Sequence, residues 1–178
     1  MRGTISYIST PRTRHYLDQL GRARETYREV QAALESLALD ARNVGAKAAR
    51  RLALYQRGVL LKSYAVSLGP DPISPKWREG DGRTPEGEYR IDYRKADSSF
   101  HRALHISYPG PKDIAVARAH GVSPGGLVMI HGTKNGLSRH QEEQLPADWT
   151  NGCVAVTDRE IDEIWRMVPD GTRIIFEP

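Results

Sequence analysis

The chain has 178 residues, of which 39% are hydrophobic and 27% charged, and its formal net charge is +4 at pH 7. This composition predicts a soluble globular protein that folds without disulfides or a structural metal, as one domain of ordinary size plus an extension. It excludes a transmembrane helix, because no stretch approaches about 18 apolar residues. It also argues against nucleic acid as a partner, because the chain has no long basic run, no zinc-ligand spacing and no aromatic stripe.

The first residues do not resemble a secretory leader. Residues 1–8 lack the apolar core of about 7–15 residues that a signal peptide needs. We therefore expect one of three arrangements: the chain starts after a leader that has been removed, it is exported by another route, or it works inside the cell.

Residues 13–43 are predicted to form one long amphipathic helix. Its apolar side chains recur every three or four residues, as one face of a helix requires. They are Leu17, Leu20, Tyr27, Val30, Leu34, Leu37 and Ala41. Pro11 precedes the helix and Gly45 follows it, as is typical of a helix start and stop. The stripe predicts either packing on the next domain or pairing with a second copy. We expect an N-terminal extension at residues 1–48 and a second domain at residues 49–178.

From residue 51 the hydrophobic pattern has a period of two, which predicts β-strands. Residues 51–56 and 59–66 predict a hairpin around Arg57 and Gly58. A long loop rich in proline and glycine follows at residues 69–83, of a length often kept for function. The remaining elements are strands at 88–93 and 103–108, a helix at 112–120, a strand ending at residue 131, a polar loop at 133–148, a helix at 159–168 capped by Asp158, and a strand at 173–176. The predicted fold is mainly β with short helices, and α+β overall once the N-terminal helix is included.

Cys153 is the only cysteine of the chain, and it follows Gly152 directly. His131 lies 22 residues earlier, at the end of an apolar segment, and is itself followed by Gly132. A thiol, a base and glycines that leave room for a substrate carbonyl are what cysteine acyl-transfer chemistry needs. A lone cysteine is also common as a small buried apolar residue, so these residues alone leave both interpretations open.

These segments resemble the L,D-transpeptidase catalytic domain, the YkuD family. The family signature is a histidine, a spacer and then Ser/Thr-His-Gly-Cys, and the segment Thr150-Asn151-Gly152-Cys153 is similar to it except at Asn151. Upstream, Thr84-Pro85-Glu86-Gly87 resembles the Thr-Pro-x-Gly loop of the family. The resemblance runs from about residue 49 to the C-terminus and points to the YafK-like branch. It implies an L,D-transpeptidase-type β-sandwich with short helices.

The resemblance also implies the role of each site residue. Cys153 is the expected nucleophile, and His131 is the expected base that takes its proton. The main-chain carbonyl of Gly132 is expected to orient the imidazole, and the backbone N–H groups around Gly152 and Cys153 to form the oxyanion hole. No cofactor and no metal are expected, because a zinc site built on the catalytic pair and further histidines matches no known ligand spacing.

Two positions depart from the family pattern. Asn151 stands where the family has a second histidine, and it can donate a hydrogen bond but cannot carry a proton at neutral pH. Ala155 stands where an arginine is common, so Arg83, Arg102 or Arg139 is expected to take over its substrate contact. The candidate oxyanion and substrate contacts are therefore Asn151, Thr150, Trp149, Tyr108 and Arg83, with packing as the alternative role of Trp149.

The function that the resemblance implies is L,D-transpeptidation of peptidoglycan stem peptides through a Cys153 thioester. One alternative is a thiol hydrolase or amidase that cuts peptidoglycan–protein or crosslink bonds, with a wall-attached lipoprotein as partner. A second alternative is a non-catalytic wall-binding module, suggested by Asn151 and Ala155. The positive net charge suits an anionic cell wall, and the expected location is the periplasm or cell envelope of a bacterium.

Overall fold

The computed structural model describes residues 18–29 and 41–178. The chain divides into two units, residues 1–36 and residues 37–178. In the first unit, residues 18–29 are helical, as predicted. Of the predicted apolar stripe, Leu20 and Tyr27 lie in this helix and are exposed, and the other positions up to residue 37 lie outside the described residues. Packing of the helix on the second unit or against a second copy therefore stays a prediction.

A strand begins the described part of the second unit, where the sequence predicted the end of the helix. β1 (Ala41–Ala46) pairs antiparallel with β2 (Arg51–Gln56) and parallel with β8 (Arg173–Glu177). The prediction of helix up to residue 43 was wrong, because pairing with these two strands overrides the local preference of the backbone. Gly45 does not stop a helix. A β-carbon added there would lie 2.6 Å from Cδ1 of Phe176, so glycine leaves room for the ring.

The described strands form one eight-stranded sheet in the order β3-β2-β1-β8-β4-β5-β6-β7. The strands not yet introduced are β3 (Val59–Ala65), β4 (Gly87–Ser98), β5 (His101–Ile106), β6 (Met129–His131) and β7 (Val154–Ala155). The predicted hairpin of β2 and β3 is confirmed, with Arg57 and Gly58 at its turn, both at positive φ. The strands predicted at β4, β5 and β8 are also present, and β4 runs further than predicted.

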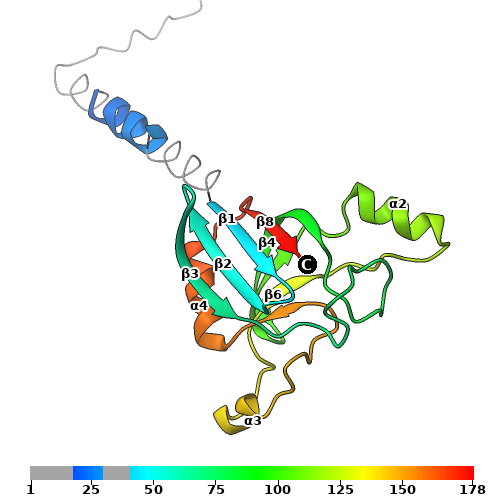
Figure 1. Ribbon diagram of the computed structural model, residues 1–178. Helices are drawn as coiled ribbons and strands as arrows, with labels where there is room; N and C mark the ends of the chain where they lie inside the picture. The colour runs from blue at the N-terminus through cyan, green and yellow to red at the C-terminus, as the bar shows by residue number, and fades with distance from the viewer. Residues whose placement is uncertain (1–17, 30–40) are drawn as a thin grey trace, which may run out of the picture. The chain divides into compact units, whose positions relative to one another are not determined.

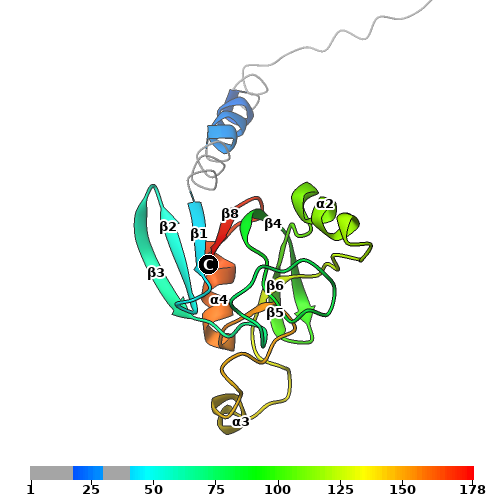
Figure 2. The same cartoon turned by 45° about the vertical axis from the view of Figure 1, so that its right-hand side comes forward.

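The sheet folds into two layers at β4 (Figures 1 and 2). The first residues of β4, from Gly87 to Arg90, pair with β8, whereas its later residues pair with β5. The core between the layers is mostly aliphatic, and its side chains include Leu52 from β2, Leu104 from β5 and Ile174 from β8. The predicted mainly β fold with short helices is therefore confirmed.

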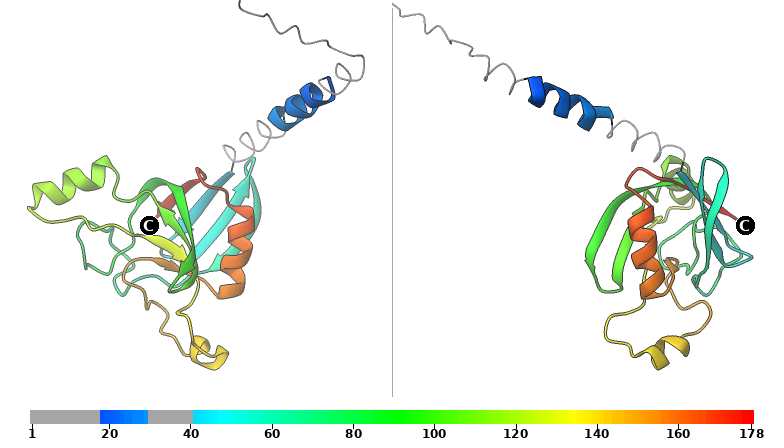
Figure 3. Two further views of the ribbon diagram at one scale, coloured as in Figure 1. Left: turned by 180° about the vertical axis from the view of Figure 1, so that it is seen from behind. Right: turned by 90° about the vertical axis from the view of Figure 1, so that its left-hand side faces the viewer.

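In residues 41–178, three short helices accompany the sheet: α2 (Pro111–Ala119), α3 (Arg139–Glu143) and α4 (Asp158–Met167). α4 packs on β5 and β6 with Ile161 and Ile164 buried (Figure 3). Its N-cap is Thr157, whose hydroxyl accepts a hydrogen bond from the Glu160 N–H, and not Asp158 as predicted. Among the described residues, no helix combines the length and the apolar character that crossing a membrane requires.

β7 has only two residues, and it has a partner on each side. It pairs in parallel with β6, and on its other side Ala155 forms a bridge with Ser67, which follows β3 in the chain. The N–H of Ser67 donates to the carbonyl oxygen of Ala155 at 2.9 Å, and the N–H of Ala155 donates to the carbonyl oxygen of Ser67 at 2.8 Å. The chain after β3 thus meets the last strand of the sheet.

Candidate active site

Cys153 lies directly before β7, where β6 and β7 run side by side. The register pairs His131 with Ala155, so the cysteine and the histidine are held by neighbouring strands. Cys153 is partly buried, and its thiol donates to the carbonyl oxygen of Leu127 at 3.6 Å. The sheet therefore brings together the two residues that the sequence singled out for chemistry.

The imidazole of His131 is buried and held at one of its two nitrogens. Nδ1 lies 2.7 Å from the carbonyl oxygen of Gly132, so Nδ1 carries the proton and Nε2 is the acceptor. The rings of Phe100 and Trp149 flank it, with centroids 4.6 and 5.7 Å away. Burial lowers the pKa of His131, and the Gly132 carbonyl opposes this by less. The imidazole is therefore neutral at neutral pH and able to accept a proton.

The thiol of Cys153 is also held in its neutral form. Burial raises its pKa, whereas a backbone hydrogen bond with Met129 and the charge of Lys76 lower it by less. The ordinary pKa of a cysteine is about 8.5, so this thiol is protonated at neutral pH. A neutral thiol with a neutral base calls for proton transfer during attack, and not for a preformed thiolate–imidazolium pair.

Thr150 fixes the turn that carries the cysteine. Its hydroxyl donates to the carbonyl oxygen of Cys153 at 2.7 Å and accepts from the N–H of Gly152 at 3.1 Å. The N–H of Thr150 itself donates to the carbonyl oxygen of Leu68 at 3.0 Å. Thr150 is buried and lines a cavity together with Cys153 and His131, so its substrate contact stays a prediction beside its role in the turn. These contacts also occupy the amide of Gly152, which is one of the two expected oxyanion donors.

Gly152 occupies a position that only glycine tolerates. Its φ is +108°, a conformation that residues with a β-carbon rarely adopt. A β-carbon here would also overlap the carbonyl oxygen of Arg83, which belongs to the 69–83 loop. The loop and the cysteine turn therefore pack backbone against backbone.

The Gly152→Ala variant is expected to lose about 2–4 kcal/mol of unfolding free energy, through backbone strain and overlap with the Arg83 carbonyl. Activity should fall by about 100-fold or more, because a displaced turn misplaces the thiol. Denaturant unfolding and activity assays measure both effects. Gly171→Ala is the matched control, since Gly171 has φ +85° and open space around its β-carbon position. Equal losses in the two variants would contradict a special role of the Arg83 contact.

Cys153 lines two cavities. The first, of about 450 Å³, contains His131 as well, and its walls include Phe100, Trp149, Lys95 and Lys134. The second, of about 540 Å³, is lined by Gly152, Lys76 and Asp81 among others. Asn151 is exposed and lines both. A larger cavity of about 670 Å³ touches Trp149 but neither Cys153 nor His131, so volume alone does not mark the site.

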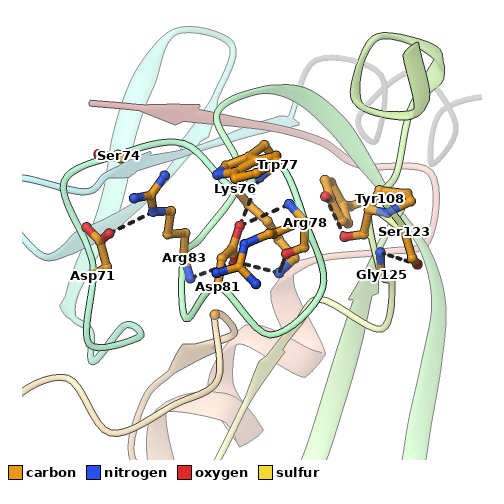
Figure 4. A network of polar contacts seen from close by, with 12 residues as sticks. Asp71, Ser74, Lys76, Trp77, Arg78, Asp81, Arg83, Tyr108, Ser123 and Gly125 are labelled. Carbon is orange, nitrogen blue, oxygen red and sulfur yellow. Dashed lines mark hydrogen bonds and ion pairs between the residues drawn. The ribbon is translucent and has the colours of Figure 1, made fainter. Parts of the chain in front are cut away.

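Two predicted substrate contacts lie away from these cavities. Nε of Arg83 donates to a carboxylate oxygen of Asp71 at 2.7 Å, so a neighbour in the same loop holds the guanidinium (Figure 4). Tyr108 is buried, and its hydroxyl donates to the carbonyl oxygen of Pro124 at 2.9 Å. Arg83 thus forms an ion pair within its loop and Tyr108 lies in the core, and a substrate contact by either one stays a prediction.

The cavities also contain side chains that sequence reasoning missed. Lys76 lies in the 69–83 loop, and the length of that loop was the only signal for it. Phe100, Lys95 and Lys134 had no local signal, because nothing in their neighbourhood distinguishes them from other residues of a hairpin or loop. Within the described part of the chain, no three His, Cys, Asp or Glu residues are grouped so that they could hold a metal ion.

Comparison with known sequences identifies relatives of this chain. The YkuD model, which describes the L,D-transpeptidase catalytic domain, matches residues 43–176. YafK of Escherichia coli (strain K12) is 34% identical over 121 residues, which cover 67% of this chain and 41% of YafK. YqjB of Bacillus subtilis (strain 168) is 29% identical over 100 residues, which cover 54% of this chain and 53% of YqjB. The chain thus spans about half or less of the length of these curated relatives.

Solved structures share the fold. The helical cell shape determining protein Pgp2 of Campylobacter jejuni matches with a TM-score of 0.61 at 23% identity, over 77% of this chain and 47% of Pgp2. Bd1075 of Bdellovibrio bacteriovorus matches with a TM-score of 0.56 at 20% identity, over 77% of this chain and 47% of Bd1075. At these identities the likeness concerns the fold alone.

Proposed function

Because the chain belongs to the L,D-transpeptidase catalytic domain family, we propose that it transfers acyl groups of peptidoglycan stem peptides through a thioester on Cys153. The observation that carries this proposal is that Cys153 and His131 line one cavity. The Gly132 carbonyl holds the imidazole so that Nε2 is the nitrogen that accepts a proton. Family membership supports an enzyme, and the neutral thiol and imidazole support a general-base mechanism.

In the first half-reaction, Sγ of Cys153 attacks the acyl carbonyl while Nε2 of His131 takes the thiol proton. A C–S bond forms and the carbonyl oxygen becomes negative. We assign the N–H of Cys153 and the side-chain amide of Asn151 as its hydrogen-bond donors. The C–N bond then breaks, His131 returns the proton to the leaving amine, and a thioester remains on Cys153.

The acceptor of the second half-reaction decides the product. An amine that attacks the thioester forms a new amide bond, whereas water forms a carboxylic acid. Cys153 lines two cavities, so the acyl chain and the acceptor need not occupy the same space. The alternative hydrolase, which would release a peptide or a wall-attached lipoprotein, therefore differs from the transpeptidase only in its acceptor.

Mass spectrometry of isolated peptidoglycan incubated with the protein tests this proposal. New crosslinked or exchanged stem peptides are the expected products, and fragments heavier by one water would identify the hydrolase. Peptidoglycan that carries a covalently attached lipoprotein is the second substrate to test, because only this material contains the peptidoglycan–protein amide bond that such an amidase would cut. No change in either substrate, together with a thiol that does not react with iodoacetamide, would contradict the proposal and favour a wall-binding module.

The cavity shared by Cys153 and His131 has two exposed lysines on its rim, Lys95 and Lys134. Stem peptides carry carboxylates, so replacing both lysines with alanine is expected to raise KM by about five- to tenfold while kcat changes little. The difference should shrink at high salt, because exposed charges are screened. Steady-state kinetics at two ionic strengths measures this, with Lys112→Ala on α2 as an exposed control that lines neither cavity. An unchanged KM would rule out a charge contribution from this rim.

We also propose that the protein acts at the cell envelope, because its proposed substrate is found there. The N-terminal residues are proposed to form an extension of the catalytic domain. The pairing of β1 with β2 and β8 supports an extension that ends before Ala41 rather than at residue 48.

A further inference from the structure

The 69–83 loop carries a buried ion pair between Lys76 and Asp81 (Figure 4). Nζ of Lys76 lies 2.9 Å from Oδ1 of Asp81, and it also donates to the carbonyl oxygen of Arg78 at 3.0 Å. The two side chains are 5% and 3% exposed. Among the ion pairs of the described residues, this is the one in which both partners are less than a tenth exposed. Burying a charge costs on the order of several kcal/mol before the attraction to its partner is counted. The buried pair therefore calls for an explanation.

Asp81 is held in its ionised form. Its carboxylate accepts hydrogen bonds from the backbone N–H groups of Trp77, Arg78 and Arg83, at 3.0, 3.1 and 3.1 Å. Burial by itself would raise the pKa of Asp81, but Lys76 and these N–H groups together hold it below its ordinary value. The carboxylate thus has four donors, and it anchors the ammonium of Lys76 at a fixed place.

Backbone contacts join this ion pair to the cysteine turn. Arg83, whose N–H binds Asp81, has its carbonyl oxygen where a β-carbon of Gly152 would lie. A β-carbon on Gly69, at the start of the loop, would likewise lie 3.0 Å from the backbone nitrogen of Gly152. Lys76, Asp81 and Cys153 then line one cavity of about 540 Å³. Only glycines permit this approach, which brings the loop that carries the buried charges against the cysteine turn.

We propose that Lys76 is a positioning residue for the chemistry of Cys153. The ammonium of Lys76, anchored by Asp81, stabilises negative charge on the cysteine sulfur during attack. This inference rests on the proposed role of Cys153 as nucleophile. It goes beyond that role because it assigns the electrostatic support to the 69–83 loop, whereas His131 is neutral and supplies only a base.

The charged groups around Cys153 have opposite expected effects. In the second cavity, Lys76 favours the thiolate, whereas Asp81 and Glu79 disfavour it. In the first cavity, the exposed Lys95 and Lys134 favour it weakly, because solvent screens them. Burial raises the pKa of Cys153, and the charge of Lys76 opposes this rise.

Alkylation of Cys153 by iodoacetamide, followed as a function of pH, tests the inference. The reagent is neutral, and the chain has a single cysteine, so the rate reports the thiolate population of one residue. Lys76→Met is expected to raise the thiol pKa by about one unit and to slow alkylation at pH 7.5 by about three- to tenfold. Asp81→Asn, which removes the opposing charge, is expected to shift the thiol pKa the other way.

The opposite signs separate an electrostatic role from a merely structural one. If the ion pair only stabilises the conformation of the loop, both variants loosen the same loop. The two shifts of the thiol pKa then have the same sign, which overturns the inference. Absence of a shift in both variants also overturns it. Lys62→Met is the control, because Lys62 forms an exposed ion pair with Glu163 away from Cys153.

Two further measurements keep the outcome decisive. Thermal unfolding shows whether each variant is folded, and if Lys76→Met is not, Lys76→Gln and the charge-keeping Lys76→Arg are compared instead. The expected result is a raised thiol pKa in Lys76→Gln and a nearly unchanged thiol pKa in Lys76→Arg. Because alkylation needs no peptidoglycan, failure of the proposed substrate would leave this result intact. Activity that survived in Cys153→Ala would instead refute the proposed function.

Discussion

Replacing Cys153 with alanine is expected to abolish acyl transfer, with a loss on the order of 10⁴-fold or more. In the proposed mechanism the cysteine sulfur is the atom that bonds to the substrate. His131 acts in the described site as a base and not as a second nucleophile. The wild-type protein should gain the mass of an acyl group during turnover, and intact-protein mass spectrometry detects this thioester. Since the chain has one cysteine, the adduct can be assigned without mapping.

The alanine variant is expected to keep its fold, because it removes a single sulfur atom from a partly buried position. Its thermal unfolding should stay close to that of the wild type, and this is the control for the loss of activity. Residual turnover above about 1% of the wild-type rate would be incompatible with a thioester mechanism.

The second large effect is expected at His131. Replacing it with glutamine removes the proton acceptor, and a positioned general base contributes about 10²- to 10⁴-fold. Glutamine keeps a polar group near the Gly132 carbonyl, so the loss should appear in kcat more than in KM. His140→Gln is the matched control, because His140 is an exposed histidine on α3. Equal activity of the His131 variant and the wild type would require another base.

The pH profile of the wild type carries the same information with a definite sign. Only the neutral imidazole accepts a proton, so activity falls as the pH drops through the pKa of His131. Burial lowers that pKa, which places the acidic limb below the ordinary value of about 6.5. The thiol also supplies the proton that His131 returns to the leaving amine, so activity falls again where that proton is lost; burial raises the pKa of Cys153, which places this alkaline limb above the ordinary value of about 8.5. A plot of kcat/KM against pH should therefore be flat between these limits, and a narrow bell within them would contradict the general-base mechanism.

The fold was predictable where its signals are local. Alternating side chains on either side of Arg57 and Gly58 indicated the β2–β3 hairpin, and helical periodicity indicated α4. β1 was missed because its residues include good helix formers and become a strand only through pairing with β2 and β8. Long-range pairing of this kind leaves little trace in the residues themselves.

The site was predictable to a similar degree. A thiol next to a glycine is visible in the sequence, and Cys153 does line the site's two cavities. The burial of Lys76 was not visible, because it arises only when the loop folds around Asp81 and packs on the cysteine turn. The ion pair of Arg83 with Asp71 was not visible for a related reason: Asp71 is one of many acidic residues until the loop has its shape.

The pairing of β7 on both sides has a consequence for how an extended peptide is recognised. A sheet edge with open backbone groups can take up a peptide as an additional strand. Here β6 occupies one edge of β7, and Ser67 occupies the other through Ala155. The strand that follows the nucleophile has no main-chain edge left to offer. In the proposed reaction, a peptide that reaches Cys153 therefore cannot be held as an additional strand on β7.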